Sequence, residues 1–226
     1  MNFIKKLEKE LKPEIDIILS HPFLKRIEKG DMSFEQLQYF AIEYAEYCYH
    51  FPRFLAFTAG NIPDDLTRMP IIENLWEEHG SGKYSGSHRQ LYNKFLEALD
   101  IDPRTLDKHP KLPDTITCVQ TLLDMCKNDH FVKSLGALGP GTEFFTNDEY
   151  DLIFKGLDKS PYLTQRELRF WKAHISLDVE HYSEMVEALY PYIHDENNCK
   201  LIKEGALKAI RMEQLFWDGL ERNIPV

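Results

Sequence analysis

The chain has 226 residues, a length that suits one domain with a large buried core better than two small ones. It carries 27 Lys and Arg against 37 Asp and Glu, and the net charge of −10 argues against a protein that grips nucleic acid or an anionic membrane surface. With 43% hydrophobic residues and only 11 Gly and 12 Pro, the composition excludes a disordered chain and disfavours a loop-rich β fold.

Helix-start signals recur along the chain. Three capping boxes, in which a hydroxyl and a Gln or Glu side chain each satisfy a free backbone N–H, begin at Ser33, Ser87 and Thr164. Apolar residues at three- and four-residue spacing follow each box, and Asp195 caps a last amphipathic stretch. The predicted helices span residues 34–59, 61–79, 88–99, 114–127, 129–138, 143–156, 164–190 and 195–217.

The connections between these helices contain the glycines and prolines that end a helix. Gly80-Ser81-Gly82 ends one helix, residues 100–113 form a connector with three prolines, and Gly139-Pro140-Gly141 interrupts the pattern again. Strand alternation is nearly absent, and there is no Gly/Ser linker, low-complexity run or internal repeat. The sequence therefore predicts a single all-α domain over residues 1–226, built as a bundle of seven or eight helices.

The amino terminus and the cysteines bear on the compartment. The first 23 residues mix charged and apolar positions and lack the apolar run of a secretory signal, and no stretch approaches the roughly 20 apolar residues of a membrane span. The four cysteines are scattered without a CxxC pair, so we interpret them as reduced thiols rather than zinc ligands. We expect a cytoplasmic protein.

The strongest chemical motif lies in the predicted helix 164–190. His174, Asp178 and His181 stand at positions i, i+4 and i+7, so Asp178 lies about 40° and His181 about 20° from His174 around the helix, and all three share one face. Buried imidazole and carboxylate groups need partners, and a metal ion would satisfy all three at once. The alternative is a half-exposed stripe of two ordinary histidines with Asp178 as an i+3 partner.

Two further candidates come from other helices. Glu77 and Glu78 end one predicted helix and His88 opens the next, so these groups could converge across the intervening glycine-rich loop. Glu143 follows the Gly-Pro-Gly segment in an otherwise apolar context. The plainer interpretation of Glu77 and Glu78 is a solvated helix end, and that of His88 is a surface histidine. Glu143 would then be a helix-start carboxylate favoured by the macrodipole.

Taken together, the run Asn74-Leu75-x-x-Glu78…His88…Glu143…His174-x3-Asp178-x2-His181 resembles the heme-oxygenase-like dimetal oxidases and oxygenases, relatives of the thiaminase TenA and the quinone-cofactor synthase PqqC. The resemblance implies the helical bundle of that family. One metal would be held by carboxylate and histidine from the first half of the chain, and the other by residues of the late motif His174-x3-Asp178-x2-His181. Glu77 is a rival to Glu78, because the loop before the histidine is a few residues longer than in the family. The implied metal-ligating and catalytic residues are Glu78, His88, Glu143, His174, Asp178 and His181.

The resemblance implies a non-heme dinuclear iron oxidase or oxygenase in a biosynthetic pathway. Its cofactors would be two Fe(II)/Fe(III) ions, with Mn an option in one site, and O2 as cosubstrate; imidazole and carboxylate suit these metals. Three carboxylates would balance most of the charge of two Fe(II) ions. The substrate would be a small amino acid, amine or carboxylic acid, with no nucleic-acid or membrane partner, and a homodimer stays open beside a monomer.

Three alternatives remain at this point. One is a self-sacrificing 4-aminobenzoate synthase, whose donor tyrosine and lysine fall here on Leu24 and near Ile153, with Tyr150 and Lys155 as shifted substitutes. The others are a metal-independent enzyme similar to PqqC or TenA, and a helical module that binds a protein partner.

Aromatic residues are candidates for the walls of a shielding pocket, although aromatic residues at helical spacing also fill ordinary cores. The candidates are Tyr44, Tyr47, Phe51, Phe54, Phe144, Phe170 and Trp171.

Overall fold

The computed structural model describes residues 2–226, apart from the side chains of Asn2 and of residues 176–180. Over this range the chain is helical and forms no strand, which confirms the predicted all-α class. None of the described helices is both long enough and apolar enough to pass through a bilayer. The α-helices are α1 (Asn2–Leu19), α2 (Pro22–Lys29), α3 (Phe34–Asn61), α4 (Asp65–Glu78), α5 (His88–Ala98), α6 (Pro113–Asn128), α7 (Phe131–Leu138), α8 (Phe144–Leu157), α9 (Arg169–Leu189) and α10 (Glu196–Asn223).

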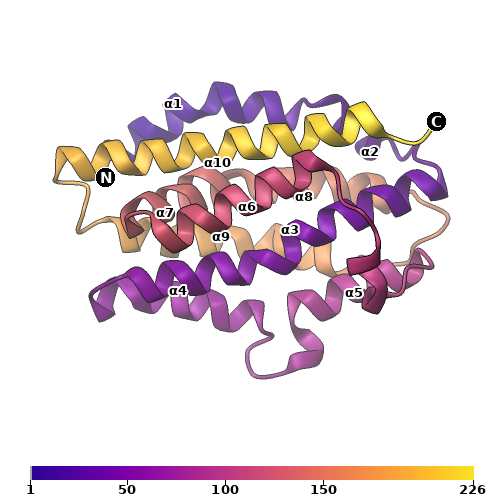
Figure 1. The fold of residues 1–226 in the computed structure, drawn as a ribbon, viewed down its shortest axis with the longest axis horizontal. Coiled ribbons are helices and arrows are strands. Elements are labelled where there is room, and N and C mark those ends of the chain that lie inside the picture. The colour runs from indigo at the N-terminus through magenta and orange to yellow at the C-terminus, as the bar shows by residue number, and fades with distance from the viewer. Residues whose placement is uncertain (1) are drawn as a thin grey trace.

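Ten α-helices in the described residues are more than the seven or eight predicted. The two additional ones, α1 and α2, lie in the first 30 residues, where the prediction placed no helix. Their apolar stripe was present in the sequence, because Ile4, Leu7, Leu11, Ile15 and Ile18 recur at three- and four-residue spacing and are all buried. Helix α1 lies against α10, as Figure 1 shows, and α2 packs on α8.

The helix caps confirm three of the predicted starts and shift a fourth. Ser33 forms both hydrogen bonds of its capping box, and the side chains of Ser87 and Asp195 each accept a backbone N–H at the start of α5 and α10. Thr164 also bonds with Glu167, but this pair closes a turn, and α9 begins five residues later, at Arg169. The helix predicted to start at residue 164 is therefore shorter than expected.

The Gly-Pro-Gly segment interrupts the α-helical pattern, as predicted, because α7 ends at Leu138 and α8 begins at Phe144. Residues Gly139–Glu143 form a π-helical turn that joins α7 to α8 without a break. A side chain at Gly141 has no room, since its Cβ would lie 2.7 Å from the Cα of Ala206 on α10. The close packing of α10 on this wider turn fixes the direction in which Glu143 emerges.

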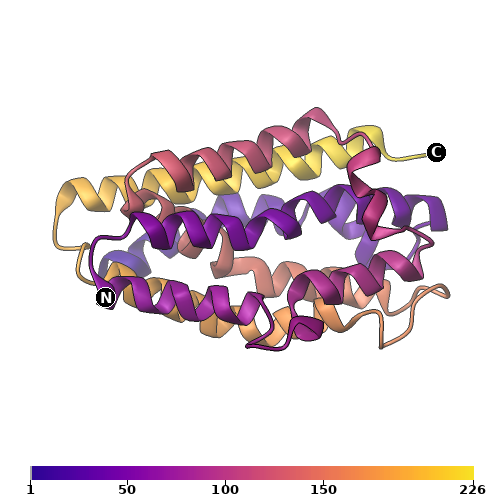
Figure 2. The ribbon, with the colours of Figure 1, turned by 60° about the horizontal axis from the view of Figure 1, so that its bottom comes forward.

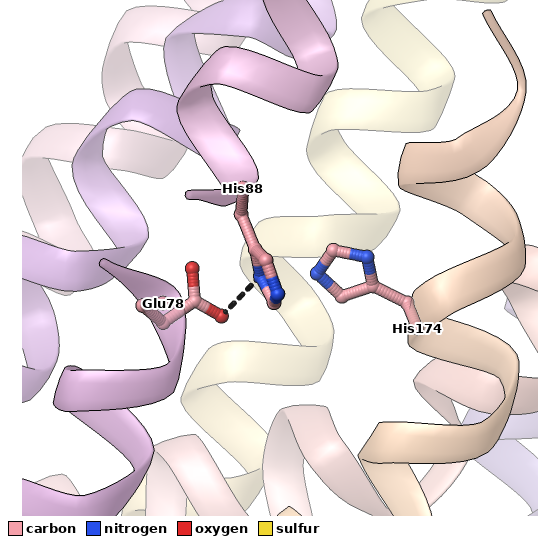
Figure 3. A group of neighbouring side chains, drawn as sticks. All are labelled: Glu78, His88 and His174. Atoms are coloured by element: carbon pink, nitrogen blue, oxygen red, sulfur yellow. Dashed lines mark ion pairs between the residues drawn. The ribbon is translucent and has the colours of Figure 1, made fainter. Parts of the chain in front are cut away.

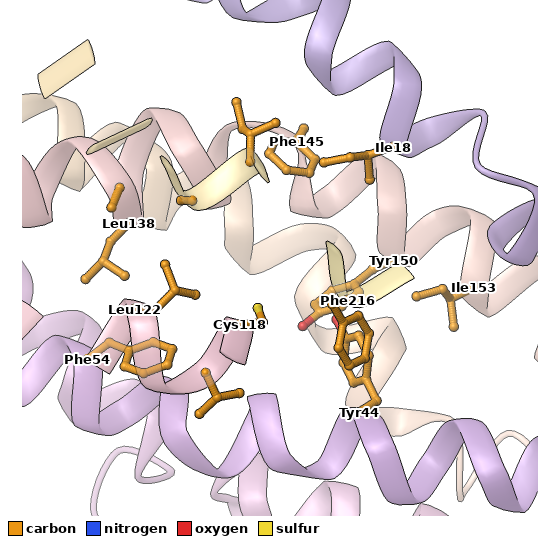
Figure 4. Packing of buried hydrophobic residues seen from close by; sticks show 14 of the residues in the cluster. Ile18, Tyr44, Phe54, Cys118, Leu122, Leu138, Phe145, Tyr150, Ile153 and Phe216 are labelled. Carbon is orange, nitrogen blue, oxygen red and sulfur yellow. The ribbon is translucent and has the colours of Figure 1, made fainter. Parts of the chain in front are cut away.

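The helices lie mostly lengthwise in a bundle, with α1 and α10 on one side and α4 and α5 on the other (Figures 1 and 2). Helix α9 packs against α4, α5 and α8, and α3 packs against α4, α5 and α6. Phe40 stacks on both Trp171 and Trp217, and these rings help to link α3, α9 and α10 through the core. Figure 4 shows Tyr44, Tyr150 and Phe216 beside one another among the buried side chains.

Two short 3-10 helices complete the connections, Tyr84–Gly86 and Pro103–Lys108. The first lies in the loop between α4 and α5. That loop reverses tightly through Gly80, Ser81 and Gly82, which all have positive φ angles of 80°, 49° and 85°. A Cβ at Gly80 would stand 2.4 Å from the carbonyl oxygen of Lys83, so only glycine fits this turn.

Candidate metal centre

Three buried side chains from three helices converge inside the bundle. Glu78 is the last residue of α4, His88 is the first residue of α5, and His174 lies in the second turn of α9. One ligand atom of each lies within 4.8 Å of the other two, and all three side chains point toward one another in Figure 3. The structure therefore brings together three of the six predicted ligands.

The electrostatics of Glu78 and His88 are those of an ion pair out of contact with water. Nδ1 of His88 lies 2.8 Å from Oε1 of Glu78, and the exposed fractions of the two side chains are 7% and 4%. Burial alone would raise the pKa of Glu78, but His88, together with smaller contributions from His174 and His181, lowers that pKa. Burial opposes the charge on His88 in the same way, yet the Glu78 carboxylate raises its pKa.

His174 is held in the form that a metal ligand needs. Its Nδ1 lies 2.8 Å from the backbone oxygen of Phe170, and because a carbonyl only accepts, Nδ1 carries the proton. The lone pair is therefore on Nε2. Burial, aided by repulsion from His88, lowers the pKa of His174 to about 3, so this imidazole is neutral at neutral pH. A hydrogen bond from the distal ring nitrogen to a carbonyl is the usual support of a metal-binding histidine.

A second group of predicted residues lies beside the first. Nε2 of His181 is 2.9 Å from Oε2 of Glu77, and its Nδ1 is 4.0 Å from Oε1 of Glu143. His181 and Glu143 are buried, whereas the Glu77 side chain is 38% exposed. The two neighbouring carboxylates of α4 thus face different histidines of α9. The side chain of Asp178, the remaining predicted ligand, lies outside the described residues.

The antiparallel packing of α4 on α9 explains this division. Near one end Glu78 meets His174, and near the other Thr67 meets Tyr192, so the two helices run in opposite directions along one another. Asn74, one turn before Glu78, is fully buried on the same face, and neither of its amide atoms has a hydrogen-bond partner among the described residues. An orphaned amide below the carboxylate marks this interface as a polar site rather than an ordinary helix contact.

The chemistry of this donor set suits iron. Three ligand atoms bound at about 2.0–2.2 Å to one ion would stand roughly 3–4.4 Å apart, and the ligand atoms of Glu78, His88 and His174 all lie within 4.8 Å of one another. Buried imidazole and carboxylate groups without a bound thiolate favour iron, manganese or zinc over copper(I). The residues present therefore fit a metal ion.

A narrow cavity of about 30 Å³ adjoins the three converging residues. Four of the seven aromatic residues predicted as pocket walls line it, namely Tyr44, Tyr47, Phe51 and Phe170. Phe54 and Trp171 are instead fully buried in the core, and Phe144 packs against Tyr182. These three residues therefore match the alternative interpretation, in which aromatic residues at helical spacing pack in or against the hydrophobic core.

Two carboxylates in the cavity wall were missed by the sequence prediction. Glu149 of α8 is 1% exposed, and Glu213 of α10 lies across from it and hydrogen-bonds with it. Both residues occupy the apolar face of their helix, at three- or four-residue spacing from Phe145 and Ile153 or from Ile210 and Trp217. A carboxylate at a core position of an amphipathic helix was the signal that could have found them.

At the two positions where a self-sacrificing 4-aminobenzoate synthase has its donor tyrosine and lysine, this chain has apolar residues. Leu24 and Ile153 are both fully buried apolar side chains. Of the two substitutes, Tyr150 lines the cavity, with its ring centroid 4.9 Å from that of His174. Lys155 is 55% exposed and pairs with Asp151 on the surface of α8.

Comparisons with known proteins agree with this description. A family described as iron-containing redox enzymes matches residues 38–214. The 4-chloro-allylglycine synthase of Streptantibioticus cattleyicolor is 27% identical over 92% of this chain and 79% of its own length. The 4-aminobenzoate synthase of Chlamydia muridarum is 27% identical over 61% of this chain, and the match spans only 56% of that relative.

The solved structures show the same fold. A TenA homologue from Pseudomonas syringae pv. tomato superimposes with a TM-score of 0.82, over 96% of this chain and 92% of the other, at 12% identity. This match confirms the predicted fold, and the family match over residues 38–214 confirms the predicted resemblance.

Proposed function

The chain belongs to the family of iron-containing redox enzymes, and from this premise we propose that it is a non-heme dinuclear iron enzyme that uses O2 to oxidise a small molecule. The observation that carries the proposal is the convergence of Glu78, His88 and His174 within 4.8 Å, directly beside His181 and Glu143. Both groups are buried, and each combines carboxylate and imidazole donors.

In this proposal the chain provides two adjoining sets of ligands. Glu78, His88 and His174 hold one ion, and His181 and Glu143 hold the other together with Asp178. This division differs from the one implied by the resemblance, because His174 joins the first-half residues instead of staying with the late motif. Glu77 hydrogen-bonds His181 and acts as a positioning residue.

Bound iron would supply the electrons and the Lewis acidity that O2 reduction needs. The residues of the chain prepare the site for that chemistry. The Phe170 carbonyl fixes the tautomer of His174, and the buried carboxylates compensate the positive charge of the ions. The rings of Phe170 and Tyr150 cover His174, which keeps bulk water from its face.

An anaerobic titration with Fe(II) tests the proposal. We expect about two irons per chain and, on exposure to O2, a transient visible absorption. His174→Ala and His181→Ala should each lose iron and the absorption, whereas His194→Ala, which removes an exposed imidazole, should retain both. An iron content near zero in the wild-type chain, or full reactivity in both site variants, would refute the proposal and favour a metal-independent enzyme or an interaction module.

The substrate is to be identified by O2 consumption in the presence of amino acids, amines and carboxylic acids. A 4-aminobenzoate synthase that consumes its own side chains is a second candidate, favoured by the names of several relatives and by the place of Tyr150 in the cavity wall. It would give its product without an added substrate, which separates the two candidates.

A further inference from the structure

The cavity next to the proposed iron site has a charged wall that the metal ligands do not explain. Its described lining includes four glutamates and two histidines but neither lysine nor arginine. Glu78 and Glu143 belong to the two proposed ligand sets, which leaves Glu149 and Glu213. These two carboxyl groups project from α8 and α10 into the same cavity and hydrogen-bond with each other.

From this arrangement we propose that Glu149 and Glu213 form a subsite for the ammonium group of a slender aliphatic amine, which is the substrate of the proposed oxidation. The inference rests on the proposed function in treating this cavity as the substrate site. It narrows the substrate from an amino acid, amine or carboxylic acid to a compound that presents a free primary ammonium group to the cavity.

The neighbours of the carboxylate pair favour a cation. The hydroxyl of Tyr47 hydrogen-bonds Thr142, and both residues line the cavity together with the pair, so several oxygen atoms surround the same space. The ring of Tyr44 adds an aromatic face, to which a cation is attracted. Acceptor oxygens around an aromatic wall match the three N–H donors of a primary ammonium group.

The described lining of the cavity brings no lysine or arginine to this pair. Two hydrogen-bonded carboxyl groups cannot both be ionised at low cost, and burial raises the pKa of Glu213. An incoming ammonium ion would provide the positive charge that the described lining lacks and would let both groups ionise. A carboxylate ligand would instead add a third negative charge at the same place.

The size of the cavity restricts the rest of the substrate. Its volume of about 30 Å³ holds a small group, and a second space of about 10 Å³ lies on the Tyr44, Tyr47 and Glu213 side of it, toward Cys118 and Phe216. Both spaces are small, and aromatic rings form part of the wall of the first and most of the wall of the second, so an unbranched chain fits them better than a ring system.

Calorimetric titration of the 226-residue chain with butylammonium chloride tests the proposal, with butan-1-ol and butanoate as comparison ligands of the same length. We expect butylammonium to bind at least tenfold tighter than butan-1-ol, and butanoate to bind no tighter than the alcohol. Equal binding of the ammonium ion and the alcohol in the wild-type chain would overturn the proposal without recourse to any variant.

Variants then assign the effect to the pair. Glu213→Gln and Glu149→Gln should each reduce the preference for butylammonium about tenfold or more, while Glu204→Gln, an exposed residue of the same helix α10, should change it less than twofold. Thermal unfolding of each variant checks that it is folded. A preference that persists in folded Glu213→Gln and Glu149→Gln would place the cation elsewhere and refute the subsite.

The titration is run on both the metal-free chain and the chain loaded anaerobically with Fe(II). A preference for the ammonium ion without iron binding would remove the proposed function and leave the subsite. Iron binding without a preference for the ammonium ion would refute the subsite and leave the proposed function. The failures of the two proposals can therefore be told apart.

Discussion

Nδ1 of His88 lies 2.8 Å from Oε1 of Glu78, although ten positions and a loop separate the two residues in the sequence. The loop is a few residues longer than the resemblance led us to expect, but it turns back through three residues with positive φ and returns the chain to the end of α4. Ser87 then caps α5 and places His88 at its first position. The additional residues therefore extend the loop without moving the histidine away from the carboxylate.

The neighbouring carboxylates of α4 should differ in their effect on iron. Glu78→Gln removes a buried charge from the group with His88 and His174, so the iron content should fall from about two to about one per chain or below. Glu77→Gln removes only a partner of His181 and should retain both ions with affinity reduced roughly 10–100-fold. Metal analysis and chelator competition measure both, with the exposed Glu73→Gln as control. A larger loss of iron in Glu77→Gln than in Glu78→Gln would identify Glu77 as the ligand instead.

The π-helical turn should be sensitive to one added methyl group. In Gly141→Ala the new Cβ meets the Cα of Ala206 at 2.7 Å, so α10 or the turn must shift. We expect a loss of about 1–3 kcal/mol in the free energy of unfolding, measured with urea, and a lower iron content because Glu143 follows two residues later. Gly60→Ala, whose Cβ meets nothing within 4 Å in α3, should instead add about 0.4–1 kcal/mol. Equal effects of the two substitutions would contradict this account.

Much of the site could be predicted from local patterns. The spacing of His174 and His181 on one helix places them on the same face, and this depends only on helical geometry. The capping signals at Ser33, Ser87 and Asp195 act within a single turn, so they too could be predicted from neighbouring residues.

The remainder depends on contacts between distant segments. Nothing local shows that Glu77 faces His181 while Glu78 faces His174, because that division follows from how α4 packs on α9. The pairing of Glu149 with Glu213 likewise requires α8 and α10 to meet, and each residue alone resembles an ordinary charge on an amphipathic helix. Sequence periodicity gives the buried face of a helix but not the helix that covers it.

Glu43 should make the stability of the chain depend on pH. This buried carboxyl accepts hydrogen bonds from the Leu112 N–H and the Thr115 hydroxyl, and burial raises its pKa above the usual 4.5. A raised pKa in the folded state means that its contribution is fully present below pH 4.5 and is lost as the pH rises through the folded value. Urea unfolding of wild type and Glu43→Gln should therefore show the wild type losing up to about 1.4 kcal/mol per pH unit relative to the variant in that window. A constant difference between them would show that Glu43 has the same pKa folded and unfolded.

Lys155 offers the clearest test of self-sacrifice. Its ammonium group is 2.5 Å from Asp151, and its side chain is 55% exposed on α8, whereas a consumed side chain must reach the oxidising centre. We therefore expect Lys155→Ala to keep the iron content and the O2 reaction of the wild type, as should Lys172→Ala, an exposed control on α9. Mass spectrometry of the intact wild-type chain after exposure to iron and O2 should show no loss of side-chain atoms. A loss of mass located at Lys155 or Tyr150, and abolished by substitution of that residue, would instead identify the chain as a consumable reagent, because an enzyme that turns over regains its own covalent structure after each reaction.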